Sequence, residues 1–376
     1  MAQAESSRPR QASTSDDNQR QKILVTGWRK AGKSSCIKTV FQHVPVKDVP
    51  YIGITQKIEK INYDTIVPIQ LWDTPSNFDI DQLDAPLGSF STLVYVMDMQ
   101  QDDSYHDAVR QAVHTIMRGY LANPAMKFSV FIHKAEALSE DYRGENYSEI
   151  QRAMTEELED FQYSSLQAYA PHLDLSDSGV CNNIFNHMVA EIKFDMTSVH
   201  DVSLRDAWSK VLQGIMEMLP AVEALLLNFT ETSGMDNSYL FDIASGVVLA
   251  TDNRHRNDAT MEQVTEYLSR FLQFREIYRH LAPSAAKSSP KADLEASDGP
   301  DGAQPKAWWD DEDTEAPWMT QATRLLPNTT IALWQFTPQL ALVVLLRTDT
   351  WHARRGMIEY NLTFLRQGVR RILMEV

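Results

Sequence analysis

An octapeptide near the start of the chain has the residue types and spacing of a phosphate-binding loop. Gly27-Trp28-Arg29-Lys30-Ala31-Gly32-Lys33-Ser34 follows the apolar run 23–25 and precedes a segment, 35–41, with the pattern of a helix. The two glycines allow backbone angles that direct successive N–H groups at a polyphosphate on the helix N-terminus. Lys33 can reach the β and γ phosphates, and the Ser34 hydroxyl can ligate Mg²⁺. The predicted phosphate-side ligands are Gly27, Arg29, Lys30, Ala31, Gly32, Lys33, Ser34 and Ser35.

Two further residues can complete a metal site beside this loop. Asp73 ends the apolar segment 67–73, and in phosphate-loop proteins an aspartate at this place holds Mg²⁺ opposite the loop serine. An aspartate that only begins a turn is the alternative, but the strand before it favours the metal role. Thr55 can close its hydroxyl or carbonyl over Mg²⁺ and the γ phosphate. We therefore predict Ser34, Thr55 and Asp73 as the Mg²⁺ ligands.

A third group of residues can recognise a purine base. His133, Lys134 and Glu136 follow the apolar run 128–132. A lysine stem that covers the base and a carboxylate that accepts both guanine N–H groups distinguish guanine from adenine. Thr197, Ser198 and Val199, at the end of another strand, can supply backbone N–H groups to guanine O6. Their order along the chain predicts a guanine-nucleotide site.

The elements that must position these residues alternate between short strands and helices from residue 22 onward. This alternation predicts an α/β fold with a doubly wound, mostly parallel sheet, and the ligand of such a sheet binds beyond the carboxyl ends of its strands. The expected strands span 22–26, 56–63, 67–73, 92–97, 127–133 and 191–197, the second and third forming an antiparallel hairpin at Asp64-Thr65. The expected helices span 33–41, 105–120, 147–161 and 203–218.

The second half of the chain has the pattern of a separate domain. A helical period over 204–227 leads into it, and β-forming residues are frequent in 239–250 and 330–346. Helices are expected over 261–281 and 358–372, the latter with an apolar residue every three or four positions. The predicted layout is a tail at 1–20, a first domain at 21–215 and a second domain at 216–376.

Two polar tracts lack the apolar periodicity of a folded segment. We predict disorder for residues 1–20 and for an acidic insertion at about 283–320. Trp308, Trp309 and Trp318 lie within or beside this insertion, either as a linear docking motif or as part of a tucked loop, and both readings stay open.

Composition limits the function classes. The chain has 376 residues and a formal net charge of −16, which argues against non-specific nucleic-acid binding. The cysteines Cys36 and Cys181 have no metal-ligand or redox spacing, which favours a reducing compartment. No segment has the length and apolarity of a membrane span, and no lipidation motif is present, so we expect no direct membrane insertion.

Several motifs in both halves match those of one protein family. They include Trp72-Asp73-Thr74-Pro75, Val94-Tyr95-Val96-Met97-Asp98, Phe131-Ile132-His133-Lys134, Met196-Thr197-Ser198-Val199 and Arg355-Gly356-Met357-Ile358-Glu359-Tyr360-Asn361. With them the chain resembles the Rag/Gtr small GTPases, in the RagC/RagD-type subclass, over nearly all of 22–376. His133 in place of the usual asparagine is itself typical of that subclass.

The resemblance implies a small-GTPase G domain followed by an α+β roadblock/longin-like dimerisation domain, with GTP or GDP and Mg²⁺ as ligands. It also implies an obligate heterodimer with a RagA/RagB-type GTPase through the C-terminal domains. A Ragulator- or EGO-type scaffold would hold the pair on the cytoplasmic face of the lysosome or vacuole, where it recruits the TOR kinase complex in response to amino acids.

Three residues depart from the family pattern. Ser76 replaces a glycine whose N–H approaches the γ phosphate, and Asn77 is one methylene shorter than the glutamine that orients the attacking water. Glu136 replaces the usual aspartate and moves the base-reading carboxylate outward. Slow or absent GTP hydrolysis and weakened guanine preference follow, with Asn77 as the candidate catalytic position. A structural pseudo-GTPase scaffold is the alternative, and an ATP-using enzyme is less supported because the second half offers no further catalytic set.

Overall fold

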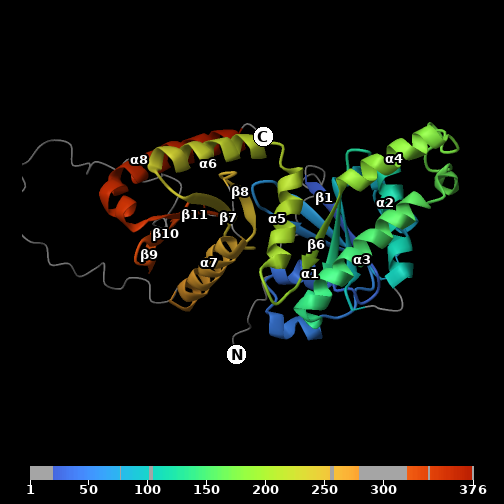
Figure 1. Cartoon of the computed structure of the whole chain (residues 1–376), viewed down its shortest axis with the longest axis horizontal. Helices are drawn as coiled ribbons and strands as arrows, with labels where there is room; N and C mark the ends of the chain where they lie inside the picture. The colour runs from blue at the N-terminus through green and yellow to red at the C-terminus, as the bar shows by residue number, and fades with distance from the viewer. Residues whose placement is uncertain are drawn as a thin grey trace, which may run out of the picture. The chain divides into compact units, whose positions relative to one another are not determined.

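The chain forms two compact units, Met1–Glu217 and Met218–Val376, each described here by itself (Figure 1). The computed structural model describes residues 20–76, 78–100, 105–254, 258–278, 320–337 and 339–374. The division lies two residues from the limit predicted between the two domains. Almost all of the predicted disordered tail and insertion, together with the three tryptophans of that region and Asn77, lie outside the described residues.

A six-stranded sheet forms the centre of the first unit, with strand order β2-β3-β1-β4-β5-β6. Its strands are β1 (Gln21–Gly27), β2 (Glu59–Tyr63), β3 (Ile69–Asp73), β4 (Thr92–Asp98), β5 (Lys127–His133) and β6 (Ile192–Thr197). Only β2 runs antiparallel, in a hairpin with β3 at the sheet edge. The predicted doubly wound, mostly parallel sheet is confirmed. The five parallel strands therefore end at one common edge.

Five α-helices cover the two faces of this sheet among the described residues. On one face α1 (Lys33–Phe41) contacts β1, β3 and α5 (Ser203–Ile215). On the other face α2 (Tyr105–Ala122) packs on β4 and against α3 (Glu140–Glu159), which contacts α4 (Ser178–Glu191) (Figure 1). Short 3₁₀ turns lie in the connections at Val46–Tyr51, Ile80–Gln82, Leu87–Ser89, Ala135–Ala137 and Tyr163–Leu166.

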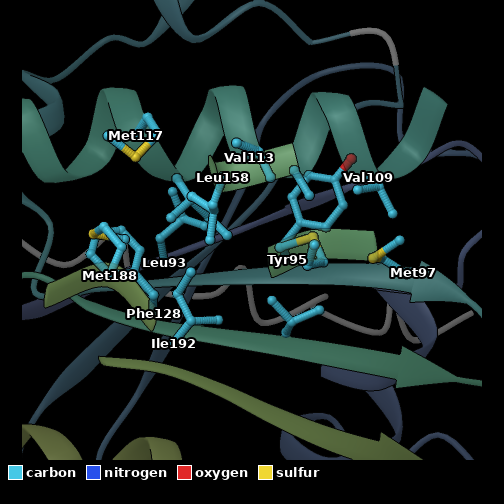
Figure 2. Packing of buried hydrophobic residues seen from close by; sticks show 14 of the residues in the cluster. Leu93, Tyr95, Met97, Val109, Val113, Met117, Phe128, Leu158, Met188 and Ile192 are labelled. Carbon is cyan, nitrogen blue, oxygen red and sulfur yellow. The ribbon is translucent and has the colours of Figure 1, made fainter. Parts of the chain in front are cut away.

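The face covered by α2 holds the main apolar core of the first unit. Figure 2 shows side chains of α2 directed at the central strands, with those of α3 and α4 beside them. Tyr95 is fully buried here, and its hydroxyl donates to the Ala108 carbonyl at 3.3 Å. Each fully buried side chain of this size contributes roughly 1.5–3 kcal/mol. This core fixes the strands whose ends carry the polar residues described below.

The second unit has a five-stranded antiparallel sheet with strand order β8-β7-β11-β10-β9. Its strands are β7 (Asn237–Asp242), β8 (Val248–Thr251), β9 (Thr320–Leu326), β10 (Thr329–Gln335) and β11 (Leu340–Arg347). Helices α6 (Leu219–Ser233) and α8 (Thr348–Met374) pack together on one face, and α7 (Asp258–Tyr278) covers the other (Figure 1). The predicted fold class, a doubly wound α/β unit followed by an α+β unit, is confirmed.

Some element boundaries differ from the sequence predictions. The helix expected to begin at 147 begins at Glu140, and α4 had no predicted counterpart. The single helical period expected over 204–227 is two helices, because Pro220 in the first turn of α6 cannot continue a preceding helix. Within the described ranges, no single helix has the length and apolarity to cross a membrane; only α5 and α6 counted together pass that test.

Candidate nucleotide-binding site

The phosphate loop connects β1 to α1, and both of its glycines are required by close contacts. A Cβ on Gly27, at φ 147°, would lie 2.1 Å from the Val96 carbonyl oxygen of β4. A Cβ on Gly32, at φ 98°, would lie 2.6 Å from Cδ2 of His133. The positive φ of each glycine and the close contacts beside it both exclude a side chain. The loop therefore packs directly on the ends of β4 and β5.

Lys33 begins α1 and turns its side chain back into the loop. Its ammonium donates to the carbonyl oxygens of Gly27 at 2.8 Å and Trp28 at 3.1 Å. Burial lowers the pKa of Lys33 to about 8, although the nearby Asp73 acts in the opposite direction. The loop thus holds a poorly solvated cation, which an anionic ligand stabilises.

The three predicted metal ligands meet at one point. Ser34 and Thr55 both donate to Oδ2 of Asp73, at 2.5 and 2.9 Å, and their hydroxyls lie 2.7 Å apart. Asp73 is fully buried, and its Oδ1 has no hydrogen-bond partner among the described residues. Burial is the main cause that raises the pKa of this carboxyl. Two hydroxyl oxygens from two separate segments therefore contact a buried carboxyl group that has one unsatisfied oxygen.

This group of oxygens fits a magnesium ion. Mg²⁺ prefers oxygen ligands and usually takes one or two carboxylates, with waters and substrate phosphates completing its shell. The described residues contain no group of three or more His, Cys, Asp or Glu side chains that could hold a metal ion. The unpartnered Oδ1 of Asp73 is the atom that a cation would satisfy.

His133 connects the phosphate loop to the end of β6. Its ring is 2% exposed, lies under Gly32, and its Nδ1 is 3.0 Å from Oγ1 of Thr197. Burial lowers the pKa of His133 to about 4, so the imidazole is neutral at pH 7. Nε2 is the ring nitrogen on the side that faces the loop.

The other predicted base-side residues lie at the same edge of the sheet. Lys134 follows β5, and Glu136 lies in the next turn, with Oε2 buried and unpartnered among the described residues. The other oxygen of Glu136 is 3.8 Å from Nε2 of the exposed His200. Ser198 is fully buried, and its N–H donates to Oγ of Ser203, so that N–H is already engaged within the chain.

The remaining predicted site residues differ in their exposure to solvent. Arg29 and Lys30 are exposed on the loop, Ala31 is buried beneath it, and Ser35 and Val199 are half-buried. Asn77 lies outside the described residues, after the half-buried Ser76.

Sequence reasoning missed two side-chain contacts of this site. Thr197, expected to act through its backbone N–H, places its Oγ1 3.0 Å from Nδ1 of His133, and Asp98, which had no assigned role, forms an ion pair with Lys134. Asp98 carried a usable signal, because it ends a buried strand at the same sheet edge as Asp73.

The fold and site together define a phosphate-loop nucleotide-binding protein of the G-protein class. The family model described as "Gtr1/RagA G protein conserved region" matches residues 22–272, and the chain belongs to that family. It is 28% identical over 366 residues to Ras-related GTP-binding protein C of Mus musculus, covering 95% of this chain and 78% of that protein.

Two other proteins are similar to this chain. The chain is 26% identical over 355 residues to GTP-binding protein gtr2 of Schizosaccharomyces pombe, covering 93% of this chain and 97% of that one. Among solved structures, Myxococcus xanthus MglB matches 43% of this chain and all of that chain, with 12% identity and a TM-score of 0.28.

Proposed function

We propose that this chain is the guanine-nucleotide-binding regulatory subunit of a Rag-type GTPase. The single observation that carries the proposal is the incomplete cluster of Ser34, Thr55 and Asp73 beside the phosphate loop, with one buried carboxylate oxygen unpartnered. A structural polar cluster is normally satisfied by its own neighbours. A bound metal–nucleotide complex would supply the missing partner of the buried Asp73 oxygen.

Lys33 has a defined task in such a site. The ammonium of Lys33 donates to two carbonyl oxygens of the loop, and β and γ phosphates would take their place as stronger, anionic acceptors. Ser34, Thr55 and Asp73 would hold Mg²⁺, which neutralises and orients the phosphate oxygens when bound. Thr55 belongs to the segment before β2, so its contact with Asp73 gives that segment a closed position that can respond to the ligand.

The base side favours guanine. The unpartnered Oε2 of Glu136 is an acceptor for the two N–H groups that guanine presents and adenine does not. The neutral His133 places Nε2 beside the loop, and the tautomer protonated at Nε2 can donate to a purine nitrogen there. Because Glu136 is one bond longer than the aspartate usual in this family, guanine preference is expected to be weakened.

Hydrolysis is expected to be slow. Ser76 and Asn77 stand where the family has glycine and glutamine, so the side-chain amide that orients the attacking water is one methylene shorter than usual. In a single-turnover assay we expect Asn77→Gln to raise the hydrolysis rate. A rate unaffected by this change, with tight nucleotide binding, would favour the alternative of a pseudo-GTPase scaffold subunit.

The second unit is proposed as the heterodimer interface with a RagA/RagB-type GTPase. Among the described strands, β9 is a sheet edge that pairs only with β10, and Leu325 and Leu326 on it are 42% and 65% exposed. Phe274 and Ile277 of α7 are also largely exposed. An open strand edge next to apolar side chains is a common site for pairing with another chain. Leu326→Asp should abolish co-purification with the partner, whereas Met357→Asp on α8 should not.

The remaining parts of the proposal rest on the family resemblance. A heterodimer of this kind would be held by a Ragulator- or EGO-type scaffold on the cytoplasmic face of the lysosome or vacuole. There its nucleotide state would report amino-acid sufficiency to the TOR kinase complex.

The test is fluorescent-nucleotide binding to the full chain, coexpressed with its partner, with GTP, GDP and ATP in the presence and absence of Mg²⁺. We expect guanine-selective, Mg²⁺-dependent binding that Lys33→Ala abolishes. The matched control is Lys38→Ala, which changes another lysine of α1. It removes an ion pair with Glu59 and should bind normally. Binding that is indifferent to Lys33 would contradict the proposal.

A further inference from the structure

We propose that Asp98 is a positioning residue for guanine-nucleotide binding. It fixes the Lys134 ammonium against the phosphate loop, so that the lysine stem covers the base and its charge does not compete for the phosphates. The inference rests on the proposed function and adds a residue that none of the sequence motifs assigned to the site.

The contacts of Lys134 carry the proposal. Its ammonium lies 2.6 Å from Oδ2 of Asp98 and donates to the carbonyl oxygen of Lys30, in the phosphate loop, at 2.8 Å. The Asp98 side chain is 7% exposed and that of Lys134 is 30% exposed. An ammonium has three N–H donors, so one remains for a ligand after these two contacts. Lys134 therefore links the end of β4 to the loop while still facing the site.

Asp98 is itself held rigidly. It is the last residue of β4 and pairs in register with His133 of β5. Its second oxygen, Oδ1, accepts the Gln100 N–H at 2.9 Å, and the Met99 N–H donates to the His133 carbonyl at the same distance. These contacts hold the Asp98 carboxylate in place. Asp98 therefore fixes the position of the Lys134 ammonium, and not the reverse.

The backbone at both ends of this link is unusual. Lys30 and Lys134 have φ values of 60° and 64°, the left-handed region that residues with a Cβ disfavour. Such conformations persist where surrounding contacts determine them, and they concentrate at binding sites. The Lys134 ammonium joins these two residues, through the Lys30 carbonyl oxygen. Loss of Asp98 would release one end of this arrangement.

The two lysines of the site differ in how their charges are compensated. Lys33 donates to two neutral carbonyl oxygens, whereas Lys134 is paired with a carboxylate at ion-pair distance. An anionic phosphate is attracted more strongly to a cation whose hydrogen bonds go to neutral acceptors. By pairing with Lys134, Asp98 therefore leaves the phosphates to Lys33 and keeps Lys134 for the nucleoside.

The experiment measures dissociation of a fluorescent GDP analogue from the full chain and compares Asp98→Asn, Lys134→Met and the double variant. Loss of one charge-assisted contact predicts dissociation about tenfold faster for Asp98→Asn. Since both residues act through one ammonium, the double variant should dissociate no faster than Lys134→Met alone. Asp98→Glu, which keeps the charge, should remain within about threefold of wild type.

The chain offers a matched control in the same unit. Asp195 of β6 pairs with Lys210 of α5, also at 2.6 Å, and its side chain is 9% exposed. Asp195→Asn removes an equivalent ion pair without touching the loop or the base side. It should lower the melting temperature about as much as Asp98→Asn and leave the dissociation rate within twofold of wild type.

Several results would overturn the inference. A folded Asp98→Asn with a wild-type rate would do so, as would an Asp98→Asn effect that persists in full on the Lys134→Met background. If Asp98→Asn does not fold, an unchanged rate in Lys134→Met decides against the inference. If the wild-type protein does not bind guanine nucleotide, the proposed function is overturned as well. If the wild-type protein binds normally and Asp98→Asn does not change the dissociation rate, only this inference is overturned.

Discussion

Two fully buried aspartates, one in each unit, have very different surroundings. In the second unit, Oδ2 of Asp252 accepts the Ser238 N–H at 3.0 Å and Oδ1 accepts the Arg254 N–H at 3.3 Å. In the first unit, Oδ2 of Asp73 accepts two hydroxyls, and Oδ1 has no partner among the described residues. A carboxylate with both oxygens bonded to backbone N–H groups stabilises a turn. One left incomplete in a buried position indicates a binding site.

The largest expected effect is on metal-dependent nucleotide binding. Asp73→Asn removes the charged metal ligand, and we expect the affinity for GDP in Mg²⁺ to fall by about 100-fold. Asp252→Asn should leave this affinity unchanged. Titration of both variants with a fluorescent GDP analogue makes the comparison, and equal losses in the two variants would remove the distinction between the aspartates.

The same two variants should change stability in opposite directions. Asp252→Asn replaces one acceptor oxygen by an NH2 group that cannot accept, which should destabilise the second unit by ~1–3 kcal/mol. The pKa of Asp73 is raised by burial, so the folded chain binds this proton more tightly than the unfolded chain does. Its contribution to metal-free stability therefore falls as pH rises from the unfolded pKa through the raised one.

Asp73→Asn mimics the neutral form of this carboxyl, so at pH 7 without Mg²⁺ it should raise the melting temperature by about 2–4 °C. Thermal unfolding followed by circular dichroism measures both variants. A lowered melting temperature for Asp73→Asn would mean that its carboxylate is a structural element like Asp252.

A third effect is the pH dependence of binding. Burial lowers the pKa of Lys33 from its ordinary value of 10.5 to about 8. The unfavourable burial of its charge is fully present below pH 8 and is relieved as pH rises from 8 to 10.5. Ligand-free stability should therefore gain from this group over that range. The GDP affinity should instead fall, by up to about tenfold per pH unit above 8, because only the charged ammonium binds phosphate well. A flat affinity from pH 7 to 10 would contradict this.

The smallest effects are expected at the base side. Glu136→Gln should reduce the preference for GDP over ADP by about tenfold, since a guanine N–H then faces an amide group. His200→Ala should change it less than twofold, because His200 is exposed and 3.8 Å from Glu136. Competition between GDP and ADP measures both. An equal response of the two variants would place base recognition elsewhere.

The parts of the fold that sequence could predict are those with strong local patterns. The strands around Val25 and Phe131 are nearly continuous apolar runs, and α1 begins at Lys33 as the loop motif requires. Helix α4 was missed because its asparagines and glycine are weak helix formers, and only Ile184 and Met188 are buried. The first two turns of α3 were missed because they are polar and have no buried residue before Ile150.

The site could be predicted where one residue's role follows from its place after a strand. Gly27, Lys33 and Asp73 are of this kind. The link between Asp98 and Lys134 joins residues 36 positions apart and depends on two left-handed backbone conformations. The Thr197 contact with His133 also depends on the register of β5 with β6. Pairings of this kind follow from tertiary structure and leave no local pattern in the sequence.

The most direct test of the central claim is amide hydrogen exchange of the full chain with and without Mg²⁺–GDP. If the incomplete polar groups of the first unit form the nucleotide site, protection should increase at 27–35, 133–136 and 197–199. The turn around Asp252 should exchange at the same rate in both samples, because its carboxylate is already satisfied. Unchanged exchange in the three segments, or protection centred on Asp252, would contradict the account.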